Sequence, residues 1–191
     1  HIRELGMDSL KANLVGVSSV KEMVERLKDK FPSPAAGDWL IGQGWDEGSF
    51  ASTAYPDRRL LDIAFPNNPV ALESLHGFAG LYNGYALKLA NIDSSTKDPE
   101  VGNIIRRMNG EPTGVMLTLA QNLIRPFIPE PSIEKIKDAI ISGLNIMANA
   151  GVTSIHEAGM TPKDVKAFVS LAESNSLPIR VYGMLDGNND E

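Results

Sequence analysis

The stretch SIEKIKDAIISGLNIMANAGVTSIHEAGMTPKDVKAFVSLAESNSLPIRVYGML, residues 132–185, decides the fold class. Its first part repeats apolar residues at helical spacing and ends at Gly151, which is suited to a left-handed helix cap. Residues 152–155 are typical of a strand, Pro162 opens a second amphipathic helix, and residues 178–185 are typical of another strand. Helices and strands alternating at this spacing predict parallel strands joined by a right-handed crossover, and hence an α/β fold.

The sequence before this stretch predicts further short elements. A capping box, Ser19 with Glu22, opens one helix. The pair Asn109-Gly110 lies between two apolar runs and predicts a hairpin with a type I′ turn. The expected helices cover 19–30 and 83–90, and the expected strands cover 14–17, 39–41, 69–72, 103–108 and 112–116.

The composition limits the partners that the chain can have. It has 191 residues, a formal net charge of -6 and no cysteine. Because phosphate backbones require clustered Lys and Arg, no nucleic-acid partner is expected. No apolar run approaches the roughly 20 residues that cross a bilayer, so no membrane partner and a cytoplasmic location are expected. Without cysteine, any metal must be bound by His, Asp, Glu or a modified Lys.

Side chains suited to a binding site follow two of the predicted strands. His156 comes directly after strand 152–155, and Trp45 and Asp46 follow strand 39–41 after a glycine-rich turn. In parallel α/β sheets, ligands bind at the carboxyl ends of the strands. These positions therefore predict a pocket for a small molecule.

Seven sequence blocks, taken in order, resemble one branch of a known superfamily. The blocks are 42–46, 61–66, 69–70, 83–87, 96–99, 110–115 and 151–156. Together they are similar to the N-substituted formamide deformylase-like branch of the metal-dependent amidohydrolases, some members of which are labelled exoenzyme regulatory proteins. The resemblance implies that the chain is a fragment of a partial (β/α)8 barrel domain. It also implies an inserted region with a hairpin over about 39–117 and βα units over 132–191.

The resemblance gives His1 a role. In this family the first barrel strand ends in His-x-His, and both imidazoles bind the catalytic metal. The spacing from His1 to Gly6, to residues 13–17 and to Ser19 fits His1 as the second of these histidines. The alternative is that His1 remains from a purification tag. The other ligands and the catalytic aspartate are expected downstream of this chain, so the isolated chain is expected to be inactive.

The implied activity is hydrolysis of amide-type C–N bonds other than peptide bonds. A divalent metal, expected to be zinc in the complete protein, would activate water and polarise the carbonyl of a small-molecule substrate. A non-catalytic ligand-binding or regulatory module on the same fold is the alternative, favoured by departures from the family pattern at Phe78 and Thr118. Open strand edges in a fragment predict self-association into a homo-oligomer.

Four residues are predicted to line the substrate pocket: Trp45, Asp46, His76 and His156. His76 lies two residues before Phe78, where relatives commonly have histidine, and in a strand this shift would keep it on the same face. Its alternative is a half-buried histidine bonded to the backbone. Asp46 and Trp45 are equally suited to capping a turn and filling a packing gap. His156 is suited to orienting substrate or a metal ligand, or to a core position with a satisfied nitrogen.

Overall fold

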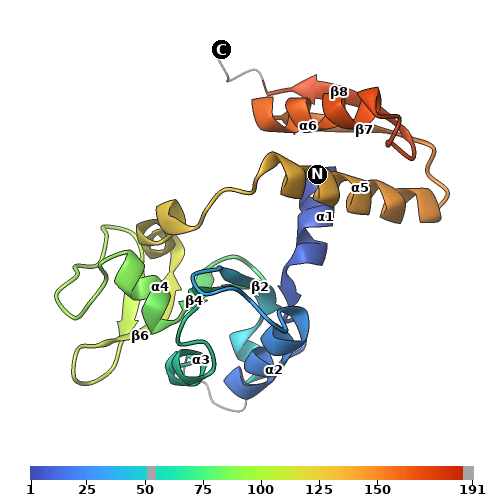
Figure 1. Ribbon diagram of the computed structural model, residues 1–191. Coiled ribbons are helices and arrows are strands. Elements are labelled where there is room, and N and C mark those ends of the chain that lie inside the picture. The colour runs from blue at the N-terminus through green and yellow to red at the C-terminus, as the bar shows by residue number, and fades with distance from the viewer. Residues whose placement is uncertain (51–54, 187–191) are drawn as a thin grey trace. The chain divides into compact units, whose positions relative to one another are not determined.

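The computed structural model describes residues 1–50 and 55–186, which form two compact units (Figure 1). Among the described residues, unit 1 combines 1–10 with 130–186, and unit 2 combines 11–50 with 55–129. Each unit contains helices and a sheet, so the predicted α/β fold is confirmed. The described residues form no closed barrel; the partial barrel and its boundaries at 39–117 and 132–191 remain predictions.

Unit 1 is built from three helices and two strands. The helices are α1 (Ile2–Leu10), α5 (Ile133–Asn149) and α6 (Pro162–Glu173), and the strands are β7 (Ser154–Met160) and β8 (Arg180–Leu185). The strands pair in parallel across α6, as the alternation of helices and strands predicts. Helix α1 was not predicted, because its nine residues have no cap signal in the sequence.

The Gly151 helix cap predicted for unit 1 is confirmed, and side-chain caps begin α5 and α6. The Ser132 side chain accepts a hydrogen bond from the Lys135 amide, and Gly151 has a φ of +84° just after α5. Thr161 and Asp164 form a reciprocal capping box at the start of α6. Each side chain satisfies a main-chain N–H that the first helical turn leaves without a partner.

Unit 2 contains a six-stranded mixed sheet. In spatial order its strands are β1 (Ala12–Asn13), β2 (Leu40–Trp45), β3 (Val70–Ser74), β4 (Ala79–Tyr82), β6 (Pro112–Leu117) and β5 (Asn103–Arg106). Strands β1 to β3 are parallel and the other pairs are antiparallel. The helices are α2 (Val20–Lys30), α3 (Arg59–Ala64) and α4 (Gly84–Leu89), with 3₁₀ helices η1 (Glu47–Ser49), η2 (Thr118–Leu123) and η3 (Arg125–Phe127).

Three local predictions for unit 2 are wrong. Residues 42–44 were predicted as a glycine-rich turn, but they continue β2 to Trp45. Residues 14–17 form a turn rather than a strand, because Gly16 has a φ of +79° and redirects the chain towards α2. The β5–β6 hairpin is present, but its turn is not type I′, since Gly110 has a positive φ and Asn109 does not. The Gly110 amide bonds to the Arg107 carbonyl at 2.9 Å, which closes a longer loop than the predicted two-residue turn.

Asn83, a member of the recognised blocks, has a structural role in unit 2. Its fully buried amide oxygen accepts from the Val70 and Ala86 amides at 2.9 and 3.1 Å. Its amide nitrogen donates to the Phe65 and Asn68 carbonyls at 3.2 and 2.9 Å. A single side chain thus caps α4 and ties it to β3 and to the end of α3.

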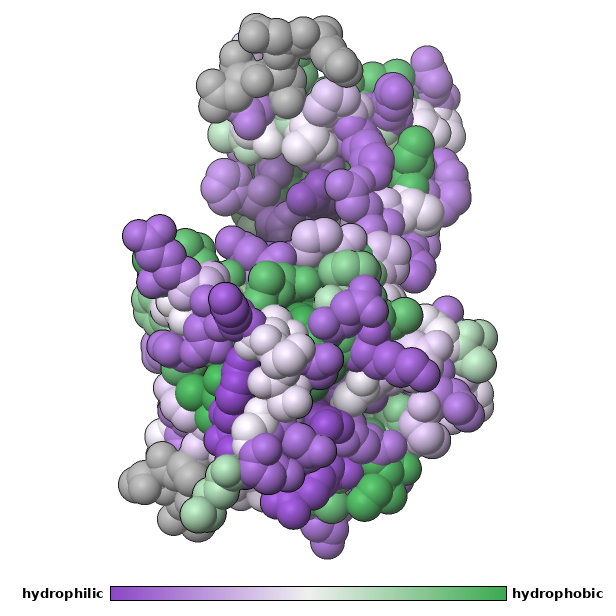
Figure 2. Space-filling view, turned by 90° about the vertical axis from the view of Figure 1, so that its left-hand side faces the viewer, coloured by the Kyte–Doolittle hydropathy of each residue, from purple (hydrophilic) through white to green (hydrophobic). Residues whose placement is uncertain are grey.

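The surface is mixed in character. On the face shown in Figure 2, hydrophilic residues cover much of the surface and hydrophobic residues lie among them in small groups. None of the helices in the described part of the chain has the length and apolar character needed to cross a membrane.

Candidate functional site

His1 lies directly before α1 in unit 1. Its side chain is 83% exposed, whereas its main-chain nitrogen lies within hydrogen-bonding distance of the buried carboxylate of Glu157. Among residues 1–50 and 55–186, no three His, Asp or Glu side chains are grouped so that they could hold a metal ion. Because a catalytic zinc needs about three protein ligands, the described residues do not complete a metal site.

His156 lies within β7, and not after the end of a strand as predicted, because the strand continues to Met160. It pairs with Tyr182 of β8, and the two rings are 5.1 Å apart at 45°. Both side chains are exposed, while Ile155 and Val181 on the opposite face pack against the core of unit 1. Strand alternation therefore directs His156 and Tyr182 to the uncovered face of this small sheet, where they are available to a ligand.

Glu157 is not among the predicted site residues, although it is one of the few buried charged groups in the described chain. Both of its carboxylate oxygens lie 3.1 Å from the Ile2 amide nitrogen. The sequence signal was present but weak: alternation places residue 157 on the same face as Ile155, so an acid occupies an apolar face.

Trp45 and Asp46 occupy the carboxyl end of β2. The Trp45 side chain is fully buried, donates its indole N–H to the Leu72 carbonyl at 3.0 Å, and stacks on Phe50. The Asp46 carboxylate accepts from the Gly48 amide at 3.0 Å and caps η1. These contacts favour the packing and capping interpretations, and direct substrate contact by either residue remains a prediction.

His76 lies in the turn between β3 and β4, so the argument from strand alternation does not apply to it. The histidine is exposed, and Gly77 next to it has a φ of +71°. The turn is held by η2: the Gln121 side chain donates to the Gly77 carbonyl at 2.9 Å, and the Thr118 amide donates to the Phe78 carbonyl at 2.7 Å. These two hydrogen bonds hold the turn that contains His76 in place.

The backbone at Thr118 is strained. Its φ is +50°, a value that a β-branched residue rarely adopts. The same segment contains Gln121, which accepts from the buried Tyr82 hydroxyl at 3.4 Å, and burial raises the pKa of Tyr82 to about 12. The strain is thus associated with the segment that holds the His76 turn.

The structure brings three of the predicted residues to one edge of the unit 2 sheet. Strands β2 and β3 are parallel neighbours, and Trp45 is in register with Ser74. The Leu75 amide also donates to the Trp45 carbonyl at 2.8 Å. Trp45, Asp46 and the His76 turn therefore all lie at the carboxyl ends of adjacent strands, as predicted for Trp45 and Asp46 but not for His76. His1 and His156 belong to unit 1.

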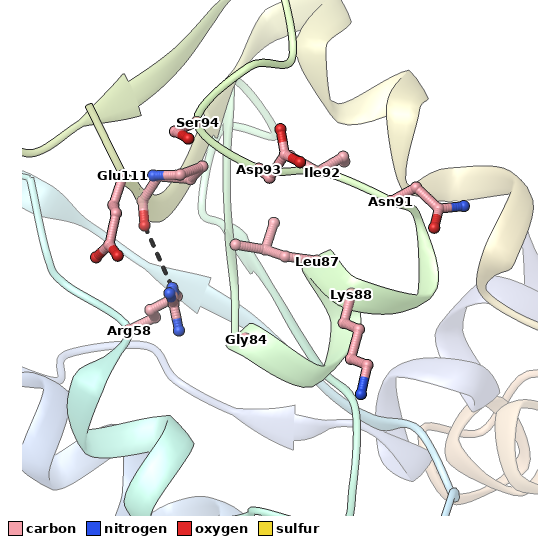
Figure 3. Close-up of a pocket in the computed structure, with 10 residues that line it drawn as sticks. Arg58, Gly84, Leu87, Lys88, Asn91, Ile92, Asp93, Ser94 and Glu111 are labelled. Carbon is pink, nitrogen blue, oxygen red and sulfur yellow. Dashed lines mark hydrogen bonds between the residues drawn. The ribbon is translucent and has the colours of Figure 1, made fainter.

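A pocket of about 400 Å³ lies elsewhere in unit 2, and none of the five predicted residues lines it (Figure 3). It is formed by Arg58, α4, the 91–94 loop and the start of β6. The Arg58 side chain donates to the Pro112 carbonyl at 3.2 Å and forms an ion pair with Asp62. Because this cation is already paired, the pocket gives no reason to place the chemistry there.

A charged cluster fastens the hairpin of unit 2 to the chain before α3. The Arg107 guanidinium forms two bonds of 2.8 Å to Asp57, and Arg59 lies 3.0 Å from the same carboxylate. Partial burial opposes ionisation of Asp57, but the bonds from Arg107 and Arg59 prevail and lower its pKa to about 2.

This lowered pKa predicts an acid-sensitive contribution to stability. An ordinary aspartate has a pKa of 3.8, so the contribution is complete above pH 4 and is lost as the pH falls through 2. Solvent screening of these partly exposed groups limits this contribution. Asp57→Asn should therefore lower the free energy of unfolding by about 1 kcal/mol at pH 6. Urea unfolding of both proteins should show this difference decreasing steadily as the pH falls from 4 to 2. A constant difference across that range would contradict the assignment.

Sequence similarity to known proteins identifies the family of this chain. The model of the Amidohydrolase family matches residues 1–191. The putative amidohydrolase YtcJ of Bacillus subtilis (strain 168) is 30% identical over 187 residues, which cover 95% of this chain and 35% of YtcJ. N-substituted formamide deformylase of Arthrobacter pascens is 25% identical over 185 residues, covering 95% of this chain and 34% of that protein.

A solved structure agrees with the sequence matches. An uncharacterized metal-dependent hydrolase from Pyrococcus furiosus superposes with a TM-score of 0.72 at 27% identity, covering 97% of this chain and 36% of that one. The chain thus spans about a third of the length of these relatives. Because the family model matches it from residue 1 to residue 191, the chain belongs to the amidohydrolase family.

Proposed function

We propose that this chain forms part of a metal-dependent hydrolase that cleaves an amide-type C–N bond in a small molecule. The observation that carries the proposal is the family match along residues 1–191. The similarity to N-substituted formamide deformylase supports an amide-type substrate, and the net charge of -6 suits a small molecule better than a nucleic acid. A bound divalent metal, which we propose to be zinc, would supply activated water and polarise the carbonyl.

The proposed contribution of this chain is one metal ligand and part of the substrate pocket. His1 has an exposed imidazole on a main chain that is held by Glu157, which suits a ligand that must meet others from outside the described residues. His156 and Tyr182 share the uncovered face of β7 and β8, which we propose to be part of a (β/α)8 barrel interior. Asp46 and His76 lie at strand ends in unit 2 and are proposed to contact substrate.

Metal content tests this role of His1. In the full-length protein we expect His1→Ala to weaken zinc binding by more than about tenfold, because a lost ligand costs at least as much as a lost supporting contact. Equilibrium dialysis followed by elemental analysis measures this, and His76→Ala, which removes an exposed histidine from unit 2, is the matched control. Stoichiometric, tightly bound zinc in the His1→Ala protein would refute the assignment.

The 191-residue chain by itself is proposed to be inactive, since its described residues supply no group of three ligands. Zinc-dependent amidase activity from this chain that is lost in His156→Ala and retained in His1→Ala would overturn that proposal.

A non-catalytic binding module is the second candidate. It is favoured by the departures from the family pattern that the resemblance indicates at Phe78, which is 70% exposed, and at Thr118. A full-length protein that binds no zinc at stoichiometric ratio would support this candidate over the enzyme.

A further inference from the structure

We propose that Glu157 is a positioning residue that holds His1 by anchoring the first turn of α1. The inference rests on the proposed function, since it concerns His1 as a metal ligand. It assigns a task to a buried acid that neither the sequence blocks nor the pocket explains.

The contacts of Glu157 are directed at the main chain next to His1. Both carboxylate oxygens lie 3.1 Å from the Ile2 amide nitrogen, and one of them also lies within hydrogen-bonding distance of the His1 main-chain nitrogen. Glu157 is 5% exposed, so water does not compete effectively for these oxygens. Its bonding partners in the described chain are thus the two nitrogens that set the path of the backbone at His1.

Helix physics explains why an acid is suited to this position. The first N–H groups of α1 have no partner within the helix, and the N-terminal end of a helix has a partial positive charge. A carboxylate accepting from these groups forms charge-assisted hydrogen bonds, which are shorter and stronger than neutral ones. Burying a carboxylate costs free energy unless hydrogen bonds satisfy it. The Glu157 carboxylate and the first N–H groups of α1 therefore stabilise each other.

Other contacts complete the fixation and leave the imidazole available. The Leu5 amide donates to the His1 carbonyl at 2.9 Å, so the helix begins immediately after His1. The Ile2 side chain, next to His1, is buried in the core of unit 1. The main chain of His1 is therefore held on both sides while its side chain is 83% exposed.

Strand alternation gives β7 two tasks. Glu157 is on the face directed to α1, and His156 is on the opposite, uncovered face. Adjacent residues of one strand thus serve the anchoring of His1 and the proposed substrate face. A shift of register by one residue would exchange the faces on which these two side chains lie. The bulge after Ala158 comes later in the strand than both residues, so it does not change their faces.

Cobalt-substituted full-length protein tests the inference. In Glu157→Gln, one oxygen still accepts a hydrogen bond, but the new NH₂ group faces main-chain donors, so the anchor is weakened without a change in size. We expect the affinity for Co²⁺ to fall about 10- to 100-fold, with an altered visible absorption spectrum of the bound ion. Glu157→Asp keeps the charge on a shorter side chain and should give an intermediate affinity.

The control is Asp164→Asn, which removes the Arg3 tether of the same helix without touching His1. It should lower thermal stability while leaving the cobalt affinity and spectrum unchanged. If Glu157→Gln and Glu157→Asp also lower only stability, Glu157 is a structural cap and the inference is wrong. If the wild-type protein binds no cobalt, the proposed function itself fails, and the inference fails with it.

Discussion

Replacing Gly6 with alanine is expected to destabilise unit 1 by about 3 kcal/mol, the upper end of the usual cost of overpacking. A Cβ atom on Gly6 would lie 1.7 Å from the Ala139 carbonyl oxygen of α5, which belongs to a helix backbone that cannot move locally. The contact is reciprocal, because a Cβ on Gly143 of α5 would lie 2.4 Å from the Ile2 carbonyl oxygen. The two helices approach so closely only because both positions lack a side chain.

The change in stability expected for Gly6→Ala is opposite in sign to the change that helix propensity predicts. In an unhindered helix, alanine is more stable than glycine by about 1 kcal/mol, so propensity alone predicts stabilisation. Hydrogen exchange followed by mass spectrometry should instead show loss of protection in α1 and α5 of the Gly6→Ala chain. Gly48→Ala is the control, since its Cβ would have contacts no closer than 3.4 Å. Unchanged or increased protection in α1 would contradict the packing.

The close approach of α1 and α5 also bears on the candidate site. Helix α1 begins directly after His1, so a displaced helix would move the proposed ligand even with Glu157 intact. Gly6→Ala in the full-length protein should therefore reduce both stability and metal affinity. This differs from Asp164→Asn, which is expected to reduce stability alone.

Replacing Trp45 with alanine is expected to cost unit 2 about 3–5 kcal/mol, as for other fully buried large aromatic residues. The indole is completely buried in the core, and its N–H bond to Leu72 would be lost together with the packing. Trp45→Phe should cost less, because the ring remains and only the hydrogen bond and part of the volume are removed.

Urea unfolding measures this prediction, with Trp39 as the remaining tryptophan and far-ultraviolet circular dichroism as a second probe. Asp46→Ala is the neighbouring control and should cost about 1 kcal/mol, the usual value of a lost cap. If Trp45→Ala changed the free energy of unfolding by less than Asp46→Ala, the residue would not have the core role seen here. In that case its proposed place in the substrate pocket would gain weight.

Local signals in the sequence were sufficient for several elements. Gly151 ends α5 and Pro162 begins α6 through backbone preferences that depend only on neighbouring residues, so both helix ends were predicted without the fold. The β5–β6 hairpin was predicted for the same reason, whereas its turn type was not. Asn109-Gly110 permits type I′ geometry, but the Arg107 and Glu111 main chains pair beyond it and select a longer loop.

Candidate site residues were less predictable, because their roles depend on partners distant in sequence. Trp45 has its indole bonded to Leu72, and the His76 turn is held by Gln121, so neither environment can be read from adjacent residues. Alternation indicates that Glu157 faces the apolar side of its strand. It does not indicate that the Ile2 amide, 155 positions away, lies within hydrogen-bonding distance.

The amino-acid sequence alone was sufficient to predict the family, the α/β class and the parallel pairing of β7 with β8. Each of these depends on patterns that repeat locally or occur in a fixed order. Tertiary structure decided which glycines admit a neighbouring helix, and which buried acid anchors His1. Both outcomes arise from contacts between segments more than a hundred residues apart. Their energies depend on distances of a few ångströms, which only the packed molecule defines.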